Sequence, residues 1–301
     1  MALPDTSSAK PAGRLLAIGV PVYNGERYLR ETLESLLAQT FREFDLVISD
    51  NASTDATPEI ASAFARADSR VRYFRNAVNL GVFRNYDLAF SRTDSKYFKW
   101  ASGNDLCHPE FLEACVSAME ADSRIGLSCP STMLFEEDPS RGEPYRFDLD
   151  FRDADPVKRF SRVIGETRLN NAFNGVYRSD WLRLTGLNRE YRGSDVAVVA
   201  AMALRGHIAL LPQRFFLRRM TPGAAGAARD SAARRQFFVG TSRDVERTPA
   251  AYRILHLARA IYTAPLPITT SARAWRYMVR HVWWSKSELW CYLRRAAPGG
   301  P

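Results

Sequence analysis

The stretch from Ile18 to Asp55 most constrains what this chain can fold into. It opens with a short apolar run, IGVPVYN, passes through a helical pattern, returns as DLVISD and stops at the polar turn DNASTD. Near-continuous apolar runs are typical of parallel strands covered on both faces. The apolar positions of the two runs are Leu16, Ile18, Val20, Leu46, Val47 and Ile48. Between them, leucines at helical spacing predict a crossover helix at Leu29, Leu33, Leu36 and Leu37.

Polar residues follow both predicted strands. Tyr23 and Asn24 end the first strand, and Asp50 and Asn51 end the second. In open α/β sheets, ligands bind outside the carboxyl ends of the strands. We therefore expect one edge of a ligand pocket at these four residues.

A helix start is the alternative interpretation of the turn DNASTD. Thr54 or Asp55 can act as the N-cap of the next helix, with Pro58 in its first turn. Capping explains the second half of the turn, but it does not explain Asp50 and Asn51, which precede it.

Further elements alternate between strand and helix and predict a mostly parallel sheet. We expect strands at 71–74 and 97–100 and helices at 82–91, 109–122 and 195–204. The polar stretch 136–155 is interpreted as a surface excursion.

Four ordered motifs resemble family-2 glycosyltransferases with a GT-A fold, of the bacterial surface-polysaccharide type. They are VPVYNGERYLRETLESLLAQTFREFDLVISDNASTD, NLGVFRNYDLAF, KYFKWASGNDLCHPEFLE and YRGSDVAVVAAMALRG, which together span residues 15 to 220. An ordered series of motifs is more specific than any single one. The resemblance implies an α/β fold with a Rossmann-like, mostly parallel central sheet flanked by helices, followed by a C-terminal helical appendage.

The predicted organisation has five parts. A flexible N-terminus, 1–14, precedes a nucleotide-sugar-binding half, 15–135, and an acceptor-binding half of the same domain, 136–222. The small, basic stretch 223–248 is expected to be a flexible loop or lid. A helical, basic and aromatic segment, 249–301, ends the chain.

The resemblance implies that the nucleotide lies at the first edge. The predicted contacts are Pro21, Val22, Tyr23, Asp50, Asn51, Arg84 and Asn104. A carboxylate or amide accepts from a base N–H or a ribose hydroxyl, while a planar base needs only an apolar or aromatic wall on its other side. Arg84 is expected to reach the diphosphate, although a solvated helix face explains it equally well.

The resemblance also implies a divalent cation at Ser102-Gly103-Asn104-Asp105, where the family carries an acidic cluster. Mg²⁺ and Mn²⁺ prefer oxygen ligands and offset the charge that develops on the leaving diphosphate. Here Asp105 and Asn104 are the predicted ligands, and Asn104 stands where a carboxylate is usual. Related chains often place a histidine near Thr221, which this chain lacks, so the site is weakened. A cap on the helix that begins at Pro109 is the alternative role of Asp105.

Asp195 opens the predicted helix DVAVVAAMALRG, where a carboxylate is ordinarily a cap. Inverting members of the family use an aspartate at the matching position as general base, which takes the proton of the acceptor hydroxyl as that oxygen attacks. We expect the same of Asp195. The acceptor side is predicted to include Asn174, Tyr177, Trp181 and Ser194, each of which packing would also explain.

Charge and composition favour an anionic partner. The chain of 301 residues carries a net charge of +9 with a pI near 9.6, which suits a sugar nucleotide or an acidic lipid surface. No nucleic-acid-binding motif accompanies the charge, so no nucleic-acid partner is expected. In 275–295, tryptophans interleave with arginine and lysine, which favours contact with an anionic membrane that would carry a lipid-linked acceptor. Packing on the domain or on a second subunit is the alternative.

The N-terminus has no apolar segment, no stretch is long enough to cross a bilayer, and the four cysteines show no pairing pattern. These features predict a cytoplasmic protein, either free or peripheral at the inner face of the plasma membrane.

The predicted function is that of an inverting glycosyltransferase, hexosyltransferase in type, which moves a sugar from a nucleotide-sugar to a hydroxyl of a glycan or a lipid-linked sugar in cell-surface polysaccharide biosynthesis. Three alternatives remain. A degenerate homologue would bind nucleotide or membrane without turnover. A sugar nucleotidyltransferase would be expected to carry a glycine-rich phosphate loop where PVYNGER stands. A retaining transferase would differ in product stereochemistry.

Overall fold

A computed structural model of the chain describes residues 14–191, 193–220 and 249–284. The predicted loop or lid at 223–248, nearly all of the flexible N-terminus, and the end of the basic aromatic segment from residue 285 onwards lie outside the described residues.

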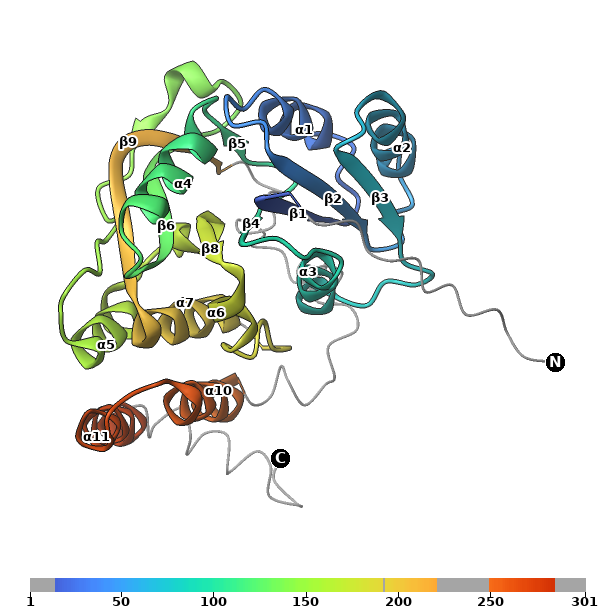
Figure 1. The fold of residues 1–301 in the computed structure, drawn as a ribbon. Coiled ribbons are helices and arrows are strands. Elements are labelled where there is room, and N and C mark those ends of the chain that lie inside the picture. Colours follow the sequence, from blue (N-terminus) through green and yellow to red (C-terminus); the bar gives the residue numbers. More distant parts are fainter. Residues whose placement is uncertain (1–13, 192, 221–248, 285–301) are drawn as a thin grey trace, which may run out of the picture.

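The described residues form a mixed α/β fold around one curled sheet (Figure 1). The strands are β1 (Leu16–Val22), β2 (Phe44–Asp50), β3 (Val71–Arg75), β4 (Tyr97–Trp100), β5 (Leu106–Cys107), β6 (Ile125–Phe135), β7 (Glu143–Pro144), β8 (Val176–Arg178) and β9 (His207–Arg219). The helices are α1 (Leu29–Leu37), α2 (Thr57–Ala67), α3 (Val82–Ser91), α4 (Phe111–Ala121), α5 (Pro156–Glu166), α6 (Ser179–Arg183), α7 (Ser194–Arg205), α10 (Pro249–Thr263) and α11 (Ile268–Trp284), with 3-10 turns η1 (Pro139–Arg141) and η2 (Asn171–Asn174).

The first part of the sheet is parallel, as the sequence predicted. β2 pairs with β1 and β3, and β1 pairs with β4, all in the same direction. All seven residues of β1 are buried, because helices cover both faces: α1 and α2 lie on one side and α3 on the other (Figure 1). The expected strand 97–100 and helix 82–91 are confirmed residue for residue.

The sheet continues without a break into the second half of the chain. β8 pairs antiparallel with both β4 and β6, and β6 pairs parallel with β9. The expected division at residue 135 is therefore crossed by the sheet itself, and the two-part organisation stays a prediction. The surface excursion 136–155 is mostly exposed, but Phe151 is buried and its backbone bridges to Ile208.

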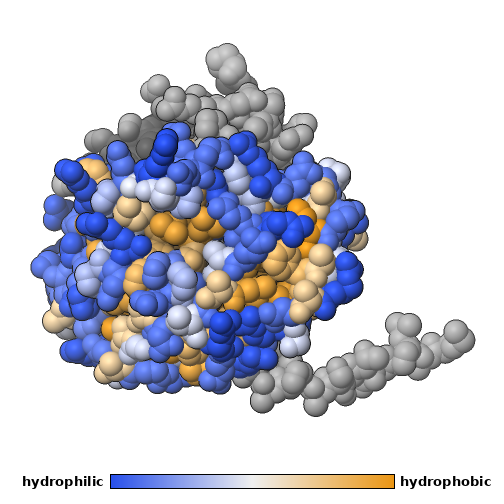
Figure 2. Space-filling view, turned by 90° about the horizontal axis from the view of Figure 1, so that it is seen from above, coloured by the Kyte–Doolittle hydropathy of each residue, from blue (hydrophilic) through white to orange (hydrophobic). Residues whose placement is uncertain are grey.

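The C-terminal helices form an added layer. α10 packs on α7, and α11 packs on α10 and α5, below the sheet in the view of Figure 1. Among the described residues, no helix combines the length and the apolar character that crossing a membrane requires. Figure 2 shows the molecule from above relative to Figure 1, so it faces the side away from the C-terminal helices. On that side, hydrophilic residues surround smaller apolar areas. That pattern is typical of helices that bury one face and expose the other.

Candidate functional site

The ends of β1 and β2 meet, as the sequence predicted, and form one edge of the site. Val22 lies opposite Asp50 in the parallel ladder, and the Asn51 amide donates to the Val22 carbonyl at 2.8 Å. Pro21 and Val22 are buried, whereas Tyr23 is half-buried and leads out of the strand. The half-buried side chain of Tyr23 therefore leaves some aromatic surface here for a planar ligand.

The Asp50 carboxylate is turned into the protein. It is fully buried, accepts from the Tyr73 hydroxyl at 2.8 Å, and accepts from the Ser53 amide at 2.9 Å. Burial, and secondarily the bond to Asp50, raise the pKa of the Tyr73 phenol. Direct contact between Asp50 and a base stays a prediction. In the structure, this carboxylate holds the Tyr73 hydroxyl and the Ser53 backbone at the end of β2.

The Asn51 side chain is also occupied by hydrogen bonds within the protein. Its side-chain oxygen accepts from the Asn76 side-chain amide at 3.1 Å and from the Leu80 backbone at 2.9 Å. Its side-chain nitrogen donates to Asn79 at 2.6 Å. These bonds fix the loop between β3 and α3 against the end of β2.

The two neighbouring residues on α3, Arg84 and Asn85, point in different directions. Asn85 is buried and ties α3 to the sheet, since it donates to the Ser49 carbonyl at 2.8 Å and accepts from the Ser49 hydroxyl at 2.7 Å. Arg84 is largely exposed and forms an ion pair with Glu190, just before α7. Its predicted contact with a diphosphate stays a prediction, and the ion pair links the two halves of the site.

Asp105 follows β4, where the sequence placed it, in a buried and positively charged setting. Its Oδ1 accepts from the Arg219 backbone amide at 2.9 Å, and its side chain is 8% exposed. Burial raises the pKa of Asp105, whereas the charges of Arg218 and Lys99 oppose that rise. Lys99 itself is fully buried; it donates to the Asn174 carbonyl and lies 4.2 Å from the centre of the Phe111 ring.

The residues around Asp105 offer few oxygen ligands to a divalent cation. Asp105 is the one carboxylate of the motif, and one of its oxygens already accepts a hydrogen bond. The Asn104 carbonyl accepts from Nε of Arg219 at 3.0 Å. In the part of the chain that the structure describes, no three histidine, cysteine, aspartate or glutamate side chains gather into a metal site built from protein ligands alone. The predicted ligation by Asp105 and Asn104 stays a prediction without a supporting cluster.

Tyr86, on α3, lies between the end of β4 and η2: its ring centre is 6.2 Å from that of Trp100 and 5.8 Å from that of Phe173. Burial raises the pKa of its phenol, and its hydroxyl forms a hydrogen bond with the Ser102 side chain. The charges of Asp105, Asp195 and Arg218 all act on this hydroxyl. A common site for the predicted base Asp195 and the predicted diphosphate position at Asp105 stays a prediction, which these charges on Tyr86 favour.

Asp195 stands in the first turn of α7, behind Gly193. Gly193 has a φ of 88°, a left-handed conformation that glycine adopts readily. The half-buried Asp195 carboxylate accepts from the Asn170 side-chain amide at 2.9 Å. This bond holds Oδ2 of the carboxylate in place.

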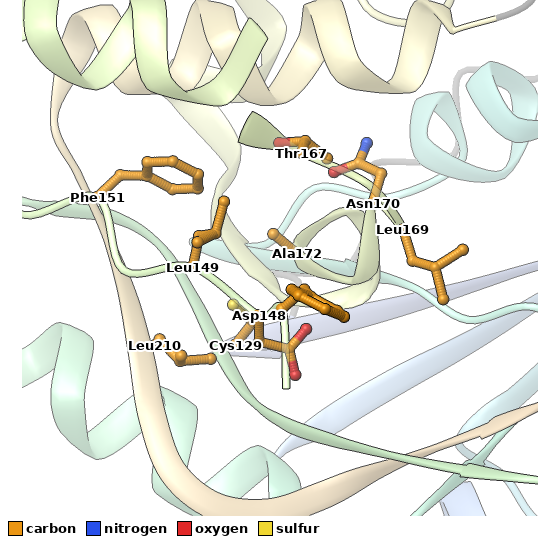
Figure 3. A pocket seen from close by; sticks show the side chains of 10 residues that line it. Cys129, Asp148, Leu149, Phe151, Thr167, Leu169, Asn170, Ala172 and Leu210 are labelled. Atoms are coloured by element: carbon orange, nitrogen blue, oxygen red, sulfur yellow. The ribbon is translucent and has the colours of Figure 1, made fainter. Parts of the chain in front are cut away.

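Asn170 also lines a small pocket with Asp148, Leu149 and Thr167 (Figure 3). The pocket offers about 20 Å³ to the centre of a water molecule, which is room for one ordered water. The Asn170 Oδ1 is buried and finds no partner among the described residues. A water in this pocket would satisfy it.

Of the four residues predicted on the acceptor side, only Asn174 lies at the site, where its Oδ1 accepts from the Ser102 hydroxyl at 3.3 Å. Tyr177 is fully buried, and its hydroxyl donates to the Phe173 carbonyl at 2.9 Å, so it belongs to the core. Ser194 is likewise fully buried. For Tyr177 and Ser194 the predicted acceptor role is wrong, because burial removes both side chains from any ligand.

Trp181 is also misplaced by the sequence interpretation. Its ring packs beside Gly126 and Gly206, where an added Cβ would come within 2.6 Å and 2.3 Å of it. Gly206 follows the last turn of α7, about 16 to 17 Å along the helix from Asp195 at 1.5 Å per residue. Trp181 therefore fills a packing gap at the far end of α7.

Three residues of the site were not predicted: Tyr86, Asn170 and Arg218. Tyr86 lies within the quoted motif NLGVFRNYDLAF, and Arg218 is the first of the two arginines that end the run RFFLRR, so a signal existed for both. Nothing near Asn170 in the sequence indicates that it contacts a residue 25 positions away.

Comparisons with known proteins agree on one family. The pattern of Glycosyl transferase family 2 matches residues 17–183. The putative glycosyltransferase EpsE of Bacillus subtilis is 30% identical over 132 residues, which are 44% of this chain and 48% of that protein. An uncharacterized glycosyltransferase of Haemophilus influenzae is 26% identical over 111 residues, 37% of this chain and 34% of that protein. This chain thus aligns with less than half the length of either relative.

Solved structures share the fold at low identity. TarS 1-349 of S. aureus in complex with UDP-GlcNAc superposes with a TM-score of 0.65 and 18% identity, covering 90% of this chain and 74% of that one. The mannosyltransferase PcManGT of Pyrobaculum calidifontis, in complex with GDP-Man and Mn²⁺, gives 0.52 and 15%, covering 94% and 86%. With more than half of its residues matched by the family pattern, and with this fold, the chain belongs to glycosyl transferase family 2 and has a GT-A fold.

Proposed function

We propose that this protein is an inverting glycosyltransferase, which moves a hexose from a nucleotide-sugar to a hydroxyl acceptor. The observation that carries the proposal is the link between the Asp105 motif and Asp195: Ser102 donates to the Asn174 side chain at 3.3 Å, and Asn170, from the same turn, donates to the Asp195 carboxylate at 2.9 Å. One carboxylate comes from the donor edge of the sheet and the other from the first turn of α7. A donor and an acceptor bound on the two sides would meet at this point.

The donor is proposed to be a nucleoside diphosphate sugar. Family membership supports this class, as do the related folds solved with UDP-GlcNAc and with GDP-Man. The ends of β1 and β2 would hold the base against Tyr23 and the backbone of Pro21 and Val22. Asp50 and Asn51 fix the shape of this edge through their internal bonds.

In the proposed reaction, Asp195 takes the proton of the acceptor hydroxyl as that oxygen attacks the anomeric carbon. The bond between the anomeric carbon and the diphosphate oxygen breaks in the same displacement, and its electron pair leaves with the nucleoside diphosphate. Attack opposite the leaving group inverts the anomeric centre. Asn170 keeps the Asp195 carboxylate in position for the proton transfer.

A divalent cation, Mg²⁺ or Mn²⁺, was predicted from the family resemblance, and the PcManGT structure contains Mn²⁺. A metal would neutralise charge on the leaving diphosphate. Because the donor set around Asp105 does not gather the ligands for it, no step here depends on one.

The acceptor is proposed to be a glycan or a lipid-linked sugar at the inner face of the plasma membrane, in cell-surface polysaccharide biosynthesis. The support is an exposed apolar row on α11. Ile268, Trp275 and Val279 are 88%, 36% and 60% exposed, and spacings of seven and four residues place them on one face. Exposed Arg276 adjoins this row, and basic residues beside aromatic ones suit an anionic interface.

The test of the proposed function compares wild type with Asp195→Asn. Release of nucleoside diphosphate is measured from a panel of UDP-, GDP- and dTDP-sugars with a membrane extract as acceptor source, and donor binding is measured by calorimetry. Loss of a general base should lower turnover about 10²- to 10⁴-fold while donor binding changes little. Magnetic resonance of the product should show an inverted anomeric configuration.

Each contrary result has its own meaning. Full turnover by Asp195→Asn would remove the proposed base. Wild-type binding without turnover of any donor would favour a homologue that only binds nucleotide, and retained configuration would identify a retaining enzyme.

A further inference from the structure

The last two residues of β9, Arg218 and Arg219, project to opposite faces because side chains alternate along a strand. Arg219 faces α1, where its side chain is 1% exposed and pairs with Glu31. It lies between the rings of Tyr28 and Phe135, 4.3 and 4.5 Å from their centres. Arg219 is thus enclosed by structural partners and has no access to a ligand.

Arg218 faces the site. Its Nη1 donates to the Asn171 side-chain oxygen at 2.5 Å, and its charge acts on Asp105 and Tyr86. Among the residues that the structure describes, Asn171 is the only hydrogen-bond partner of the Arg218 side chain. Asn171 is fixed in turn, since it donates to Asp148 at 2.9 Å. A guanidinium has five N–H donors, so most of this fork remains for a ligand.

The charges near Asp105 are arranged for an anion. A divalent cation that binds together with a diphosphate takes one or two protein carboxylates, and water and phosphate oxygens complete its ligands. Here the single carboxylate is accompanied by two positive groups, Arg218 and the buried Lys99. A divalent cation at Asp105 would meet repulsion from both, whereas a diphosphate would meet attraction.

We infer that the guanidinium of Arg218 holds the diphosphate of the nucleotide-sugar in place of a divalent cation, so that this chain binds and uses its donor without metal. The inference rests on the proposed function and specifies which side chain of that site binds the leaving nucleoside diphosphate. Arginine matches phosphate through parallel, charge-assisted hydrogen bonds and stays protonated at any working pH.

Arg218 would act as the bond to the anomeric carbon breaks. The electron pair of that bond passes to the diphosphate oxygen, whose negative charge rises, while the acceptor proton passes to Asp195. No oxidant, reductant or further reactant is involved. The fixed positive charge of Arg218 stabilises the developing anion and undergoes no proton transfer.

The experiment is calorimetric titration with UDP and with GDP, each in EDTA and in Mn²⁺, on wild type, Arg218→Ala and Arg218→Lys. Wild type should bind one nucleotide with affinities that agree within about twofold in the two conditions. Arg218→Ala should bind it about ten- to a hundredfold more weakly, as expected when a charge-assisted hydrogen bond is lost. The nucleotide affinity of Arg218→Lys should lie between those of wild type and Arg218→Ala, because lysine keeps the charge but lacks the paired N–H donors of the guanidinium.

Arg214→Ala is the matched control. It removes the same charge from the same strand, but Arg214 is exposed and lies four residues, about 13 Å, from Arg218. Its binding should equal that of wild type. UMP and GMP supply a second control, since loss of Arg218 should weaken the diphosphates more than the monophosphates. A variant that was merely misfolded would weaken both equally.

Two results overturn the inference, and they are distinguishable. In the first, wild type binds nucleotide only with Mn²⁺, and Arg218→Ala does not change that binding. This result would mean that a metal, and not Arg218, holds the diphosphate, and the proposed function would stand. Absence of nucleotide binding in both conditions would overturn the proposed function, and this inference with it.

Discussion

The side-chain amide of Asn170 donates to the carboxylate of Asp195 across 2.9 Å. Among the described residues, this is the hydrogen bond that holds the Asp195 carboxylate. Asn170 comes from the turn that precedes η2, whereas Asp195 comes from α7, and η2 packs directly on α7. The orientation of the proposed base therefore depends on a contact between two separate segments.

Replacement of Asn170 by alanine should lower turnover about tenfold, because Asp195 would lose the bond that orients it while its carboxylate remains. Nucleotide affinity should not change, since the donor edge lies at β1 and β2. The check is a comparison of kcat with the calorimetric Kd for the donor. Asn170→Asp should be more harmful than Asn170→Ala, because a like charge would face Asp195. An equal fall in kcat and in donor affinity would point to a structural role instead.

The sequence predicted the scaffold well because its signals are local. Apolar runs placed β1 and β2, and helical spacing placed α1 and α3. The meeting of Val22 with Asp50 followed from the general geometry of parallel sheets. The prediction that Asp105 and Asp195 share one site came from the resemblance to the family.

Side-chain partners were not predictable, because they join distant segments. Asp50 looked like a ligand of the base, yet its partner Tyr73 lies 23 residues away on β3. Tyr177 and Trp181 looked like acceptor residues, but an aromatic side chain near a motif fits the core equally well. Only the fold distinguishes a ring that fills a gap beside Gly126 from one that faces a ligand.

Arg219→Ala should destabilise the fold by about 3 kcal/mol or more, because the Asn104 and Glu136 carbonyls would lose a buried donor. Arg218→Ala should change the free energy of unfolding by less than about 1 kcal/mol, since Arg218 is only half-buried. Urea unfolding followed by circular dichroism measures both. Similar losses for the two variants would contradict the assignment of one arginine to the core and the other to the site.

His256, on α10, fastens the C-terminal helices to the segment before Asp195. Its Nδ1 lies 2.8 Å from the Tyr191 hydroxyl, and its Nε2 lies 3.3 Å from the Thr185 carbonyl. A carbonyl only accepts, so Nε2 carries the proton and Nδ1 accepts from Tyr191. Burial lowers the pKa of His256 from 6.5 to about 4. The ring is therefore neutral in the folded protein at neutral pH.

Stability should consequently fall as the pH is lowered from 6.5 to 4. In that window the unfolded chain binds a proton at His256 that the folded chain does not, which favours unfolding by about 3 kcal/mol across the full window. His256→Gln should remove this contribution, so its free energy of unfolding should depend less steeply on pH than that of wild type. Chemical unfolding at a series of pH values tests it, and parallel curves for the two proteins would refute the role of His256.

The exposed row on α11 should bind anionic lipid if α11 meets the membrane. Trp275→Ser with Val279→Ser should weaken cosedimentation with phosphatidylglycerol vesicles about tenfold, since two apolar side chains would no longer enter the interface. Val78→Ser is the matched control, because Val78 and Val279 are each 60% exposed and Val78 lies in the loop before α3. Neutral phosphatidylcholine vesicles should bind all proteins weakly. Equal binding of the double variant and wild type to anionic vesicles would leave this row as ordinary helix surface, without a role at the membrane.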